Sequence, residues 1–200
     1  MNYNGPKVRI SRKLDLETVP KASKFKQRKP YPPGQHGPTK RRAKQSDYGR
    51  QLLEKQRLRL QYNVSEKQMH NYYKRATGYT GNTGEILMQL LETRLDALVF
   101  RSGLATTIYA ARQFVSHGHI LVNGRRVNVS SYRCFANDVI SIKPKSRSLE
   151  CFQDAIRGAS PVPYLQLSKA DFSVTLLHIP TREEIPAICE ISLVVEYYSR

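Results

Sequence analysis

The sequence predicts an α+β protein, in which a basic N-terminal arm and a small helical region precede two helices packed on a small, mostly antiparallel sheet. Leucines recur with a helical period from Leu87 to Leu98. A second helix can open at Thr106-Thr107, and a hairpin is indicated around Asn123-Gly124, because this dipeptide tolerates the positive φ of a two-residue turn. Segregated helices and strands are typical of this fold class.

The charge of the chain is strongly and unevenly positive. Its 200 residues include 33 Lys and Arg against 16 Asp and Glu, which gives a net charge of +17 and a pI near 10. Residues 143–200 hold seven bases and seven acids, so the whole surplus lies in residues 1–142. The size and the uneven distribution of this surplus predict a polyanionic partner rather than a merely well-solvated surface.

Membrane, secreted and disulfide-bonded classes are not expected. No stretch approaches the roughly 18 to 20 apolar residues that a membrane span needs. Met1 is followed by bases and prolines rather than by the apolar run of a secretory signal, which favours the cytosol or an organelle interior. Cys134, Cys151 and Cys189 are odd in number and form no C-x-x-C pair, so buried thiols are favoured over disulfides or a zinc site.

Residues 1–45 are predicted to form a basic, proline-rich extended arm. They hold thirteen Lys or Arg, two acidic residues and six of the eleven prolines, with few apolar positions to bury. Glycines within Pro32–Pro38 would let backbone N–H groups approach phosphate closely. An arm that orders on a partner is favoured over a flexible solubilising tail.

Two capped helices are predicted after the arm. Ser46 can cap a helix that reaches about Tyr62. Ser65-Glu66-Lys67-Gln68 is a capping-box sequence that opens the next helix.

The second of these helices has two distinct faces. Met69, Tyr72, Tyr73 and Ala76 form one apolar stripe, which favours a core position for the tyrosines over stacking on unpaired bases. Another face, which either follows a phosphate backbone or is simply solvated, carries Lys67, His70 and Lys74.

A long helix is predicted from Asn82, a candidate cap, to Gly103, which can adopt the left-handed conformation that ends helices. Arg94 and Arg101 are seven residues apart and share a face outside its leucine stripe. After the helix that opens at Thr106-Thr107 comes the hairpin. Phosphate-seeking donors would be held at fixed spacing around this corner: Arg112, His117, His119, Arg125 and Arg126.

The remaining residues extend the sheet. Strands are predicted at 139–142, 164–167 and 172–177, and a helix at 148–157. Residues 191–198 are strongly apolar and fit either a helix or a strand.

The sequence offers no catalytic motif and no clustered metal ligands. His117 and His119 lack a third ligand, so RNA contact or exposure is favoured over metal binding. Asp96 could suggest a nucleophile, but its position beside Arg94 better suits an ion pair. We therefore expect no enzyme activity, no metal and no cofactor.

Short motifs along the chain resemble a known family. One set is similar to the RNA-binding module named after small-subunit ribosomal protein S4: Arg94-Leu95-Asp96, Ser116-His117-Gly118-His119, Val122-Asn123-Gly124-Arg125 and Asn137-Asp138-Val139. A second set resembles the rest of the bacterial and organellar S4 family: Pro33-Gly34-Gln35-His36-Gly37, Ser46-Asp47-Tyr48-Gly49, Gly81-Asn82-Thr83-Gly84-Glu85 and the ending Val194-Val195-Glu196-Tyr197-Tyr198-Ser199-Arg200. Together the motifs cover nearly the whole chain.

The resemblance implies a domain order. A helical domain would comprise residues 46–92 and 179–200, with the C-terminal segment closing back on the part that contains Tyr48 and Tyr72. Residues 93–178 would form an inserted S4-type RNA-binding domain with a C-terminal strand extension. Many relatives carry a metal-binding cysteine cluster in the arm, whereas this chain has no cysteine before Cys134. The arm is therefore expected to be ordered by RNA and packing.

The resemblance also implies a function. Family members are structural constituents of the small (30S) ribosomal subunit that bind 16S-type ribosomal RNA at a helix junction in its 5′ domain. They nucleate assembly of the subunit body and contribute to translational accuracy. Further implied partners are small-subunit ribosomal protein five and messenger RNA at the entry channel, in a bacterial cytoplasmic ribosome or an organelle ribosome.

The expected RNA-binding residues combine exposed bases, candidate caps and turn residues from the whole chain. Lys40, Arg41, Arg42 and Lys44 would lie nearest the messenger RNA. The full set is Lys7, Arg9, Arg12, Lys13, Lys40, Arg41, Arg42, Lys44, Arg50, Lys55, Arg57, Arg59, Lys67, His70, Lys74, Arg75, Arg94, Arg101, Thr107, Arg112, Ser116, His117, His119, Asn123, Arg125 and Arg126.

Two rival classes stay open. S4 modules also occur in RNA-modifying enzymes and some synthetases, but these carry a separate catalytic domain, for which no residues remain here. A quality-control protein that binds ribosomal particles transiently would wash off at moderate salt, whereas an integral component would stay bound.

Overall fold

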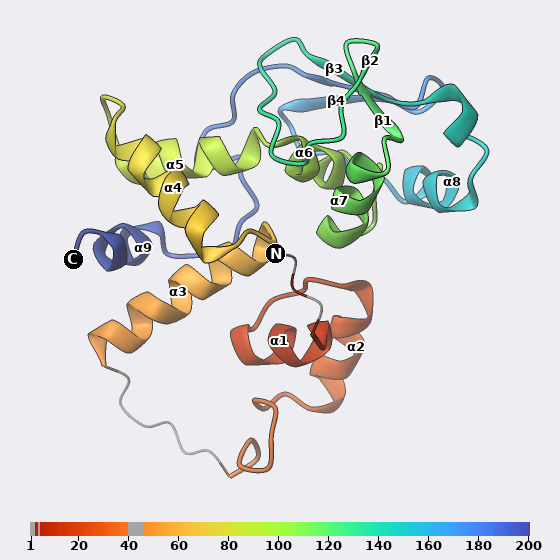
Figure 1. Ribbon diagram of the computed structural model, residues 1–200. Helices are drawn as coiled ribbons and strands as arrows, with labels where there is room; N and C mark the ends of the chain where they lie inside the picture. Colours follow the sequence, from red (N-terminus) through yellow and green to blue (C-terminus); the bar gives the residue numbers. More distant parts are fainter. Residues whose placement is uncertain (1–2, 4, 40–45) are drawn as a thin grey trace. The chain divides into compact units, whose positions relative to one another are not determined.

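The computed structural model describes residues 3, 5–39 and 46–200 (Figure 1). The chain forms two compact units. The first unit comprises Met1–Gly84 and Ala187–Arg200, and the second comprises Glu85–Pro186. The second unit is thus one continuous stretch between two parts of the first. The boundaries predicted at residues 92 and 178 fall inside the second unit, and the arm belongs to the first.

Part of the arm is helical, where the sequence predicted an extended segment. It contains α1 (Lys7–Leu14) and α2 (Pro20–Arg28). Leu14 and Leu16 are buried and pack with Leu60, which lies outside the arm, in a small apolar cluster. The prediction was wrong because the few apolar residues of the arm are buried in a cluster that a neighbouring helix completes.

Helices α3 (Asp47–Gln61) and α4 (Glu66–Thr77) begin where the capping residues predicted. Ser46 Oγ accepts a backbone N–H from the first turn of α3 at 3.2 Å. At the start of α4, Ser65 and Gln68 exchange both bonds of a capping box, each at 3.3 Å. These bonds satisfy amide groups that the first helical turn leaves unpaired.

The C-terminal helix α9 (Ile191–Tyr198) packs along α3 and also contacts α4. The segment whose pattern fitted helix or strand is therefore a helix. The ring of Tyr197 lies 5.9 Å from that of Tyr48, and the ring of Tyr198 stacks on Tyr73 at 5.1 Å between centroids. The chain end closes back on the helical region, as the resemblance implied.

Two side chains of α3 hold the segment that leads into α9. The Gln61 side chain donates to the carbonyl of Ile188 and accepts from its N–H, both at 2.9 Å. The Glu54 carboxylate accepts the N–H of Glu190 at 3.0 Å. The first unit is completed by residues more than a hundred positions away in the sequence.

The single helix predicted from Asn82 to Gly103 is divided into α5 (Thr83–Glu92) and α6 (Leu95–Arg101). Arg94 interrupts it with an extended backbone, φ −70° and ψ 142°. The chain around Arg94 instead pairs with residues 130–134 through backbone hydrogen bonds. The prediction missed this break because both helices bury leucines of the same continuous stripe.

The second unit contains a five-stranded antiparallel sheet, which confirms the predicted fold class. The strand order is β2-β1-β3-β5-β4. The bounds are β1 (Ile120–Val122), β2 (Arg125–Arg126), β3 (Val139–Ile142), β4 (Leu165–Ser168) and β5 (Ser173–Leu176). In the register of the hairpin, Val122 lies opposite Arg125.

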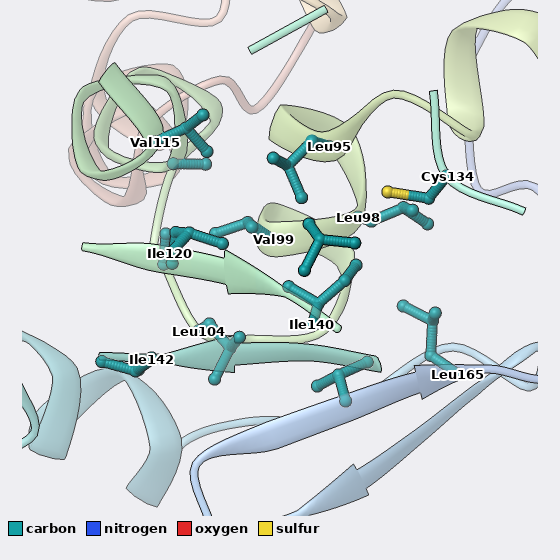
Figure 2. Packing of buried hydrophobic residues seen from close by; sticks show 14 of the residues in the cluster. Leu95, Leu98, Val99, Leu104, Val115, Ile120, Cys134, Ile140, Ile142 and Leu165 are labelled. Atoms are coloured by element: carbon teal, nitrogen blue, oxygen red, sulfur yellow. The ribbon is translucent and has the colours of Figure 1, made fainter. Parts of the chain in front are cut away.

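Three helices meet the sheet to form the core of the second unit: α6, α7 (Ile108–Ser116) and α8 (Glu150–Arg157). A short 3-10 helix, η1 (Pro144–Ser146), precedes α8. Figure 2 shows the packing of buried side chains from the helices and strands: Leu95, Leu98, Val99, Val115, Ile120, Ile140 and Ile142. Each such side chain contributes about 1.5 to 3 kcal/mol by leaving water.

A buried ion pair lies beside this core. Arg94 Nε and Nη2 donate to the two carboxylate oxygens of Asp96 at 3.0 and 2.7 Å. The side chains of Arg94 and Asp96 are 1% and 0% exposed, and Arg112 Nη1 lies 3.8 Å from the same carboxylate. The expected ion-pair role of Asp96 is confirmed.

Replacing Asp96 with Asn should lower the free energy of unfolding by about 3 to 5 kcal/mol, because the charge of Arg94 stays buried without its counter-charge. Denaturant unfolding followed by circular dichroism measures this loss. Asp154→Asn is the matched control, since Asp154 is 69% exposed in its pair with Arg157 and should change stability little. Equal effects of the two variants would contradict the prediction.

Candidate nucleic-acid interface

The β1–β2 turn is fixed by its own residues. Asn123 and Gly124 both have positive φ, 49° and 76°, as a two-residue hairpin turn requires. The Asn123 amide donates to Asp138 at 2.8 Å and accepts from the N–H of Val139 at 2.9 Å. These bonds connect the turn to the start of β3, so Asn123 positions the hairpin. Arg125 and Arg126 of the hairpin are exposed.

The connection between α7 and β1 places Arg126 beside the helix end. Thr107 caps α7 by accepting the N–H of Ala110 at 3.1 Å. At the other end, Gly118 has φ +73°, and a side chain there would overlap the guanidinium of Arg126. The positive φ favours glycine at this position, and a side chain there would displace the Arg126 guanidinium.

His119 lies at the same corner and is half-buried. Its Nδ1 lies 2.9 Å from Ser146 Oγ, and its ring lies 6.1 Å from that of His117. Burial lowers the pKa of His119, and the nearby charges of His117, Lys143 and Arg126 lower it further. Ser116 is exposed at the end of α7 and donates its hydroxyl to the carbonyl of Gln113 at 3.0 Å.

Three predicted site residues of the second unit are directed inward instead. Arg94 is buried against Asp96, and Arg112, with a 16% exposed side chain, lies beside the same carboxylate. Arg101 donates to the buried carboxylate of Glu92 at 2.6 Å. Arg94 and Arg101 thus do not share an exposed face.

In the first unit, α4 presents the predicted basic face. Lys67, His70, Lys74 and Arg75 are all exposed, while Met69 is buried on the opposite side. The tyrosines of the apolar stripe are half-buried, and Tyr73 contacts α9. This arrangement favours the packing role over the stacking role for Tyr73.

The four bases of α1 are unequally exposed. Arg9 and Lys13 are exposed, whereas Lys7 and Arg12 are half-buried. Arg12 Nη2 donates to the carbonyl of Tyr31 at 2.9 Å, and its guanidinium lies over the Tyr31 ring. The arm residues Lys40, Arg41, Arg42 and Lys44, by contrast, lie outside the described residues.

Bases of α3 mainly stabilise the unit itself. Lys55 is buried, and its Nζ lies 2.9 Å from the Glu66 carboxylate. Arg57 donates to Glu54 and to a backbone carbonyl of the arm. Arg59 is half-buried, and Arg50 is exposed in an ion pair within its own helix.

Lys143 was missed by the sequence analysis, although it faces the corner that includes His119 and Arg126. Its N–H donates to the carbonyl of His119 at 2.8 Å, which places it opposite that residue. Lys143 was not predicted as a site residue because residues 143–200 contain equal numbers of basic and acidic residues. Its position directly after a predicted strand was the available signal.

The described residues present bases on both units but hold no group of three or more His, Cys, Asp or Glu that could bind a metal ion. Among them, every helix is too short or too polar to cross a bilayer. The exposed bases of the first unit include residues of α1, α2, α3 and α4, and those of the second include Arg125 and Arg126 of the β1–β2 hairpin. Such donors at fixed spacing suit a folded polyanion.

Comparison with known families defines the class. Residues 93–140 match the S4 domain, so the second unit contains an RNA-binding module. Residues 2–92 match the ribosomal protein S4/S9 N-terminal domain. The chain is therefore an RNA-binding protein of ribosomal type and not an enzyme, as expected.

Similarity over the full length identifies the family. The small ribosomal subunit protein uS4 of Streptomyces griseus is 48% identical, with 100% of this chain and 99% of that protein covered. The uS4 proteins of Bifidobacterium animalis and Geobacillus kaustophilus are 47% and 46% identical, covering 100% and 99% of this chain and 99% and 98% of theirs. The chain belongs to the uS4 family, and these relatives are bacterial, which supports a cytoplasmic ribosome.

The Lys55–Glu66 pair predicts acid sensitivity. Burial opposes ionisation of Glu66, but hydrogen bonds from Lys55 and Tyr198 outweigh it and hold the pKa of Glu66 below its ordinary value. This lowered pKa stabilises the fold above pH 4.5, the ordinary value, and the stabilisation is lost as the pH falls through the lowered pKa.

In denaturant unfolding across a pH series, Glu66→Gln should therefore be less stable than the wild type at neutral pH and should lose less stability on acidification. Glu183→Gln, which alters an exposed carboxyl, serves as the control and should follow the wild type. If the free energy of unfolding changed with pH in the same way for Glu66→Gln and the wild type, the proposed role of the Lys55–Glu66 pair would be contradicted.

Proposed function

We propose that this protein is a structural constituent of the small ribosomal subunit and a primary binder of 16S-type ribosomal RNA at a helix junction in the 5′ domain. The observation that carries the proposal is the extent of the family match, which covers the whole chain rather than the S4 domain alone. The relatives that match over this length are named small ribosomal subunit proteins.

The distribution of charge supports RNA as the ligand. The first unit contains 21 Lys and Arg against seven acids, and the second contains twelve against nine. Several bases of each unit are exposed, while Asp96, Glu92 and Glu54 are buried with cations. Other acids are exposed beside bases, as in the pairs Asp47–Arg50 and Asp154–Arg157. The support for RNA therefore comes from the excess of bases over acids, which is largest in the first unit.

The proposed mechanism rests on electrostatics and shape. Each exposed Lys or Arg that neutralises a phosphate releases counterions, so binding weakens steeply with salt. Side chains cannot easily read the deep groove of A-form RNA, so specificity would come from the spacing of donors on each unit. A helix junction concentrates phosphates in a fixed arrangement that such donors match.

The proposal extends to assembly and decoding. By holding a junction of the 5′ domain, the protein would nucleate assembly of the subunit body. At the messenger RNA entry side it would contact small-subunit ribosomal protein five and influence translational accuracy. The arm residues Lys40, Arg41, Arg42 and Lys44 would lie nearest the messenger RNA.

Equilibrium binding to an isolated 5′-domain fragment of 16S-type RNA, against a duplex competitor of equal length and across a salt series, tests the core of this proposal. We expect tight binding that survives the competitor and has a steep salt dependence. Equal affinity for both RNAs would reduce the protein to a generic polycation. Retention on small subunits through a moderate-salt wash distinguishes an integral component from a transient factor.

Replacing Arg125 with Ala should weaken binding to the 5′-domain RNA and lower the slope of log affinity against log salt by about one unit, because one phosphate contact is lost. Arg157→Ala is the matched control, since it removes one charge from a 77% exposed arginine of the same unit. The control should leave the slope unchanged. Identical slopes for both variants and the wild type would exclude the hairpin from the interface.

A further inference from the structure

The corner between α7, β2 and η1 gathers basic groups from separate elements around one histidine. His119 follows α7, and its Nδ1 lies 2.9 Å from Ser146 Oγ of η1. The charged or titratable groups that face it are His117 at the end of α7, Arg126 of β2 and Lys143 after β3. All three of these groups lower the pKa of His119.

The remaining neighbours of His119 are apolar and fix its orientation. Its ring packs edge-on against Phe114 of α7, at 6.3 Å between centroids, and against Phe152 of α8, at 5.9 Å. The N–H of His119 donates to the carbonyl of Phe114 at 3.0 Å, and its carbonyl accepts from Lys143 at 2.8 Å. The imidazole is thus held between the core and the basic groups of the corner.

We propose that His117, His119, Arg126 and Lys143 form a proton-linked binding site for a backbone phosphate of RNA, in which His119 takes up a proton as the phosphate binds. This inference rests on the proposed function and adds Lys143 and the proton to it. Arg126 and Lys143 supply permanent positive charge. His119 supplies a charge that the free protein disfavours and that a phosphate stabilises.

The direction of the pH dependence follows from the surroundings of His119. In the free protein, burial and three neighbouring bases lower the pKa of His119. A bound phosphate places a negative charge beside those bases and raises the pKa of His119 again. Proton uptake on binding requires affinity to increase as the pH falls through the raised pKa, by about tenfold for each unit of difference between the two pKa values.

The test is binding of the full-length protein to the 5′-domain RNA fragment at constant ionic strength between about pH 8 and pH 6, where an unperturbed histidine titrates. For the wild type we expect affinity to rise about three- to tenfold toward pH 6. His119→Asn keeps a polar group near Ser146 but cannot take up the proton, so its affinity should rise less toward pH 6 than that of the wild type. His178→Asn, which alters a histidine paired with Glu184 outside the corner, should retain the wild-type pH dependence.

Each outcome decides the inference. Tight, competitor-resistant binding that does not vary with pH would overturn the proton linkage and leave the proposed function intact. The absence of specific binding at every pH would overturn the proposed function itself. A rise in affinity for His119→Asn equal to that of the wild type would assign the proton to another group and overturn the role of His119.

Calorimetry on the wild type removes any dependence on the folding of the variant. Binding heats measured in two buffers of different ionisation enthalpy count the protons taken up, and up to about one per complex is expected. Zero uptake would overturn the proposal without any substitution.

The part of Lys143 is tested by comparing Lys143→Gln with Lys145→Gln, an exposed neighbour. Lys143→Gln should weaken binding at every pH more than Lys145→Gln does. Equal losses would exclude a specific place for Lys143 in the site.

Discussion

The buried pairing of Arg94 with Asp96 is the interaction on which the architecture of the second unit depends. It stands at the point where the backbone leaves α5, pairs briefly with the loop before β3, and begins α6. Desolvating two charges is costly, so the pair is tolerated only because both carboxylate oxygens receive a donor. One short segment thereby joins the helices to the sheet that carries the hairpin.

Pairing with buried acids divides the bases of the chain into two groups. Lys55 and Arg101 are held by acids inside their own units, where they stabilise the fold. Arg125 and Lys67 are exposed and available to a partner. Net charge alone cannot separate these groups, because the distinction depends on which few acids are buried and which bases lie beside them.

Local chemistry explains what could be predicted from the sequence. Caps at Ser46 and Ser65 and the turn at Asn123-Gly124 depend on neighbouring residues only, and the structure has them where they were expected. The break at Arg94 depends on backbone pairing with a loop about forty residues away, and burial of Lys55 depends on Glu66 of another helix. Such long-range partners leave no periodic signal. The corner around His119 was predicted, but Lys143 joins it only through the pairing of β3 with β1.

The discontinuity of the first unit sets an order of events during synthesis. Its helix α9 is synthesised after the whole of the second unit, whereas the second unit is a single uninterrupted stretch. Domains fold as units during synthesis, so the inserted unit can acquire its core while the surrounding one still lacks α9. Until α9 has been synthesised, the surface of α3 that receives it stays uncovered, so this ribosomal protein completes its discontinuous unit after its continuous one.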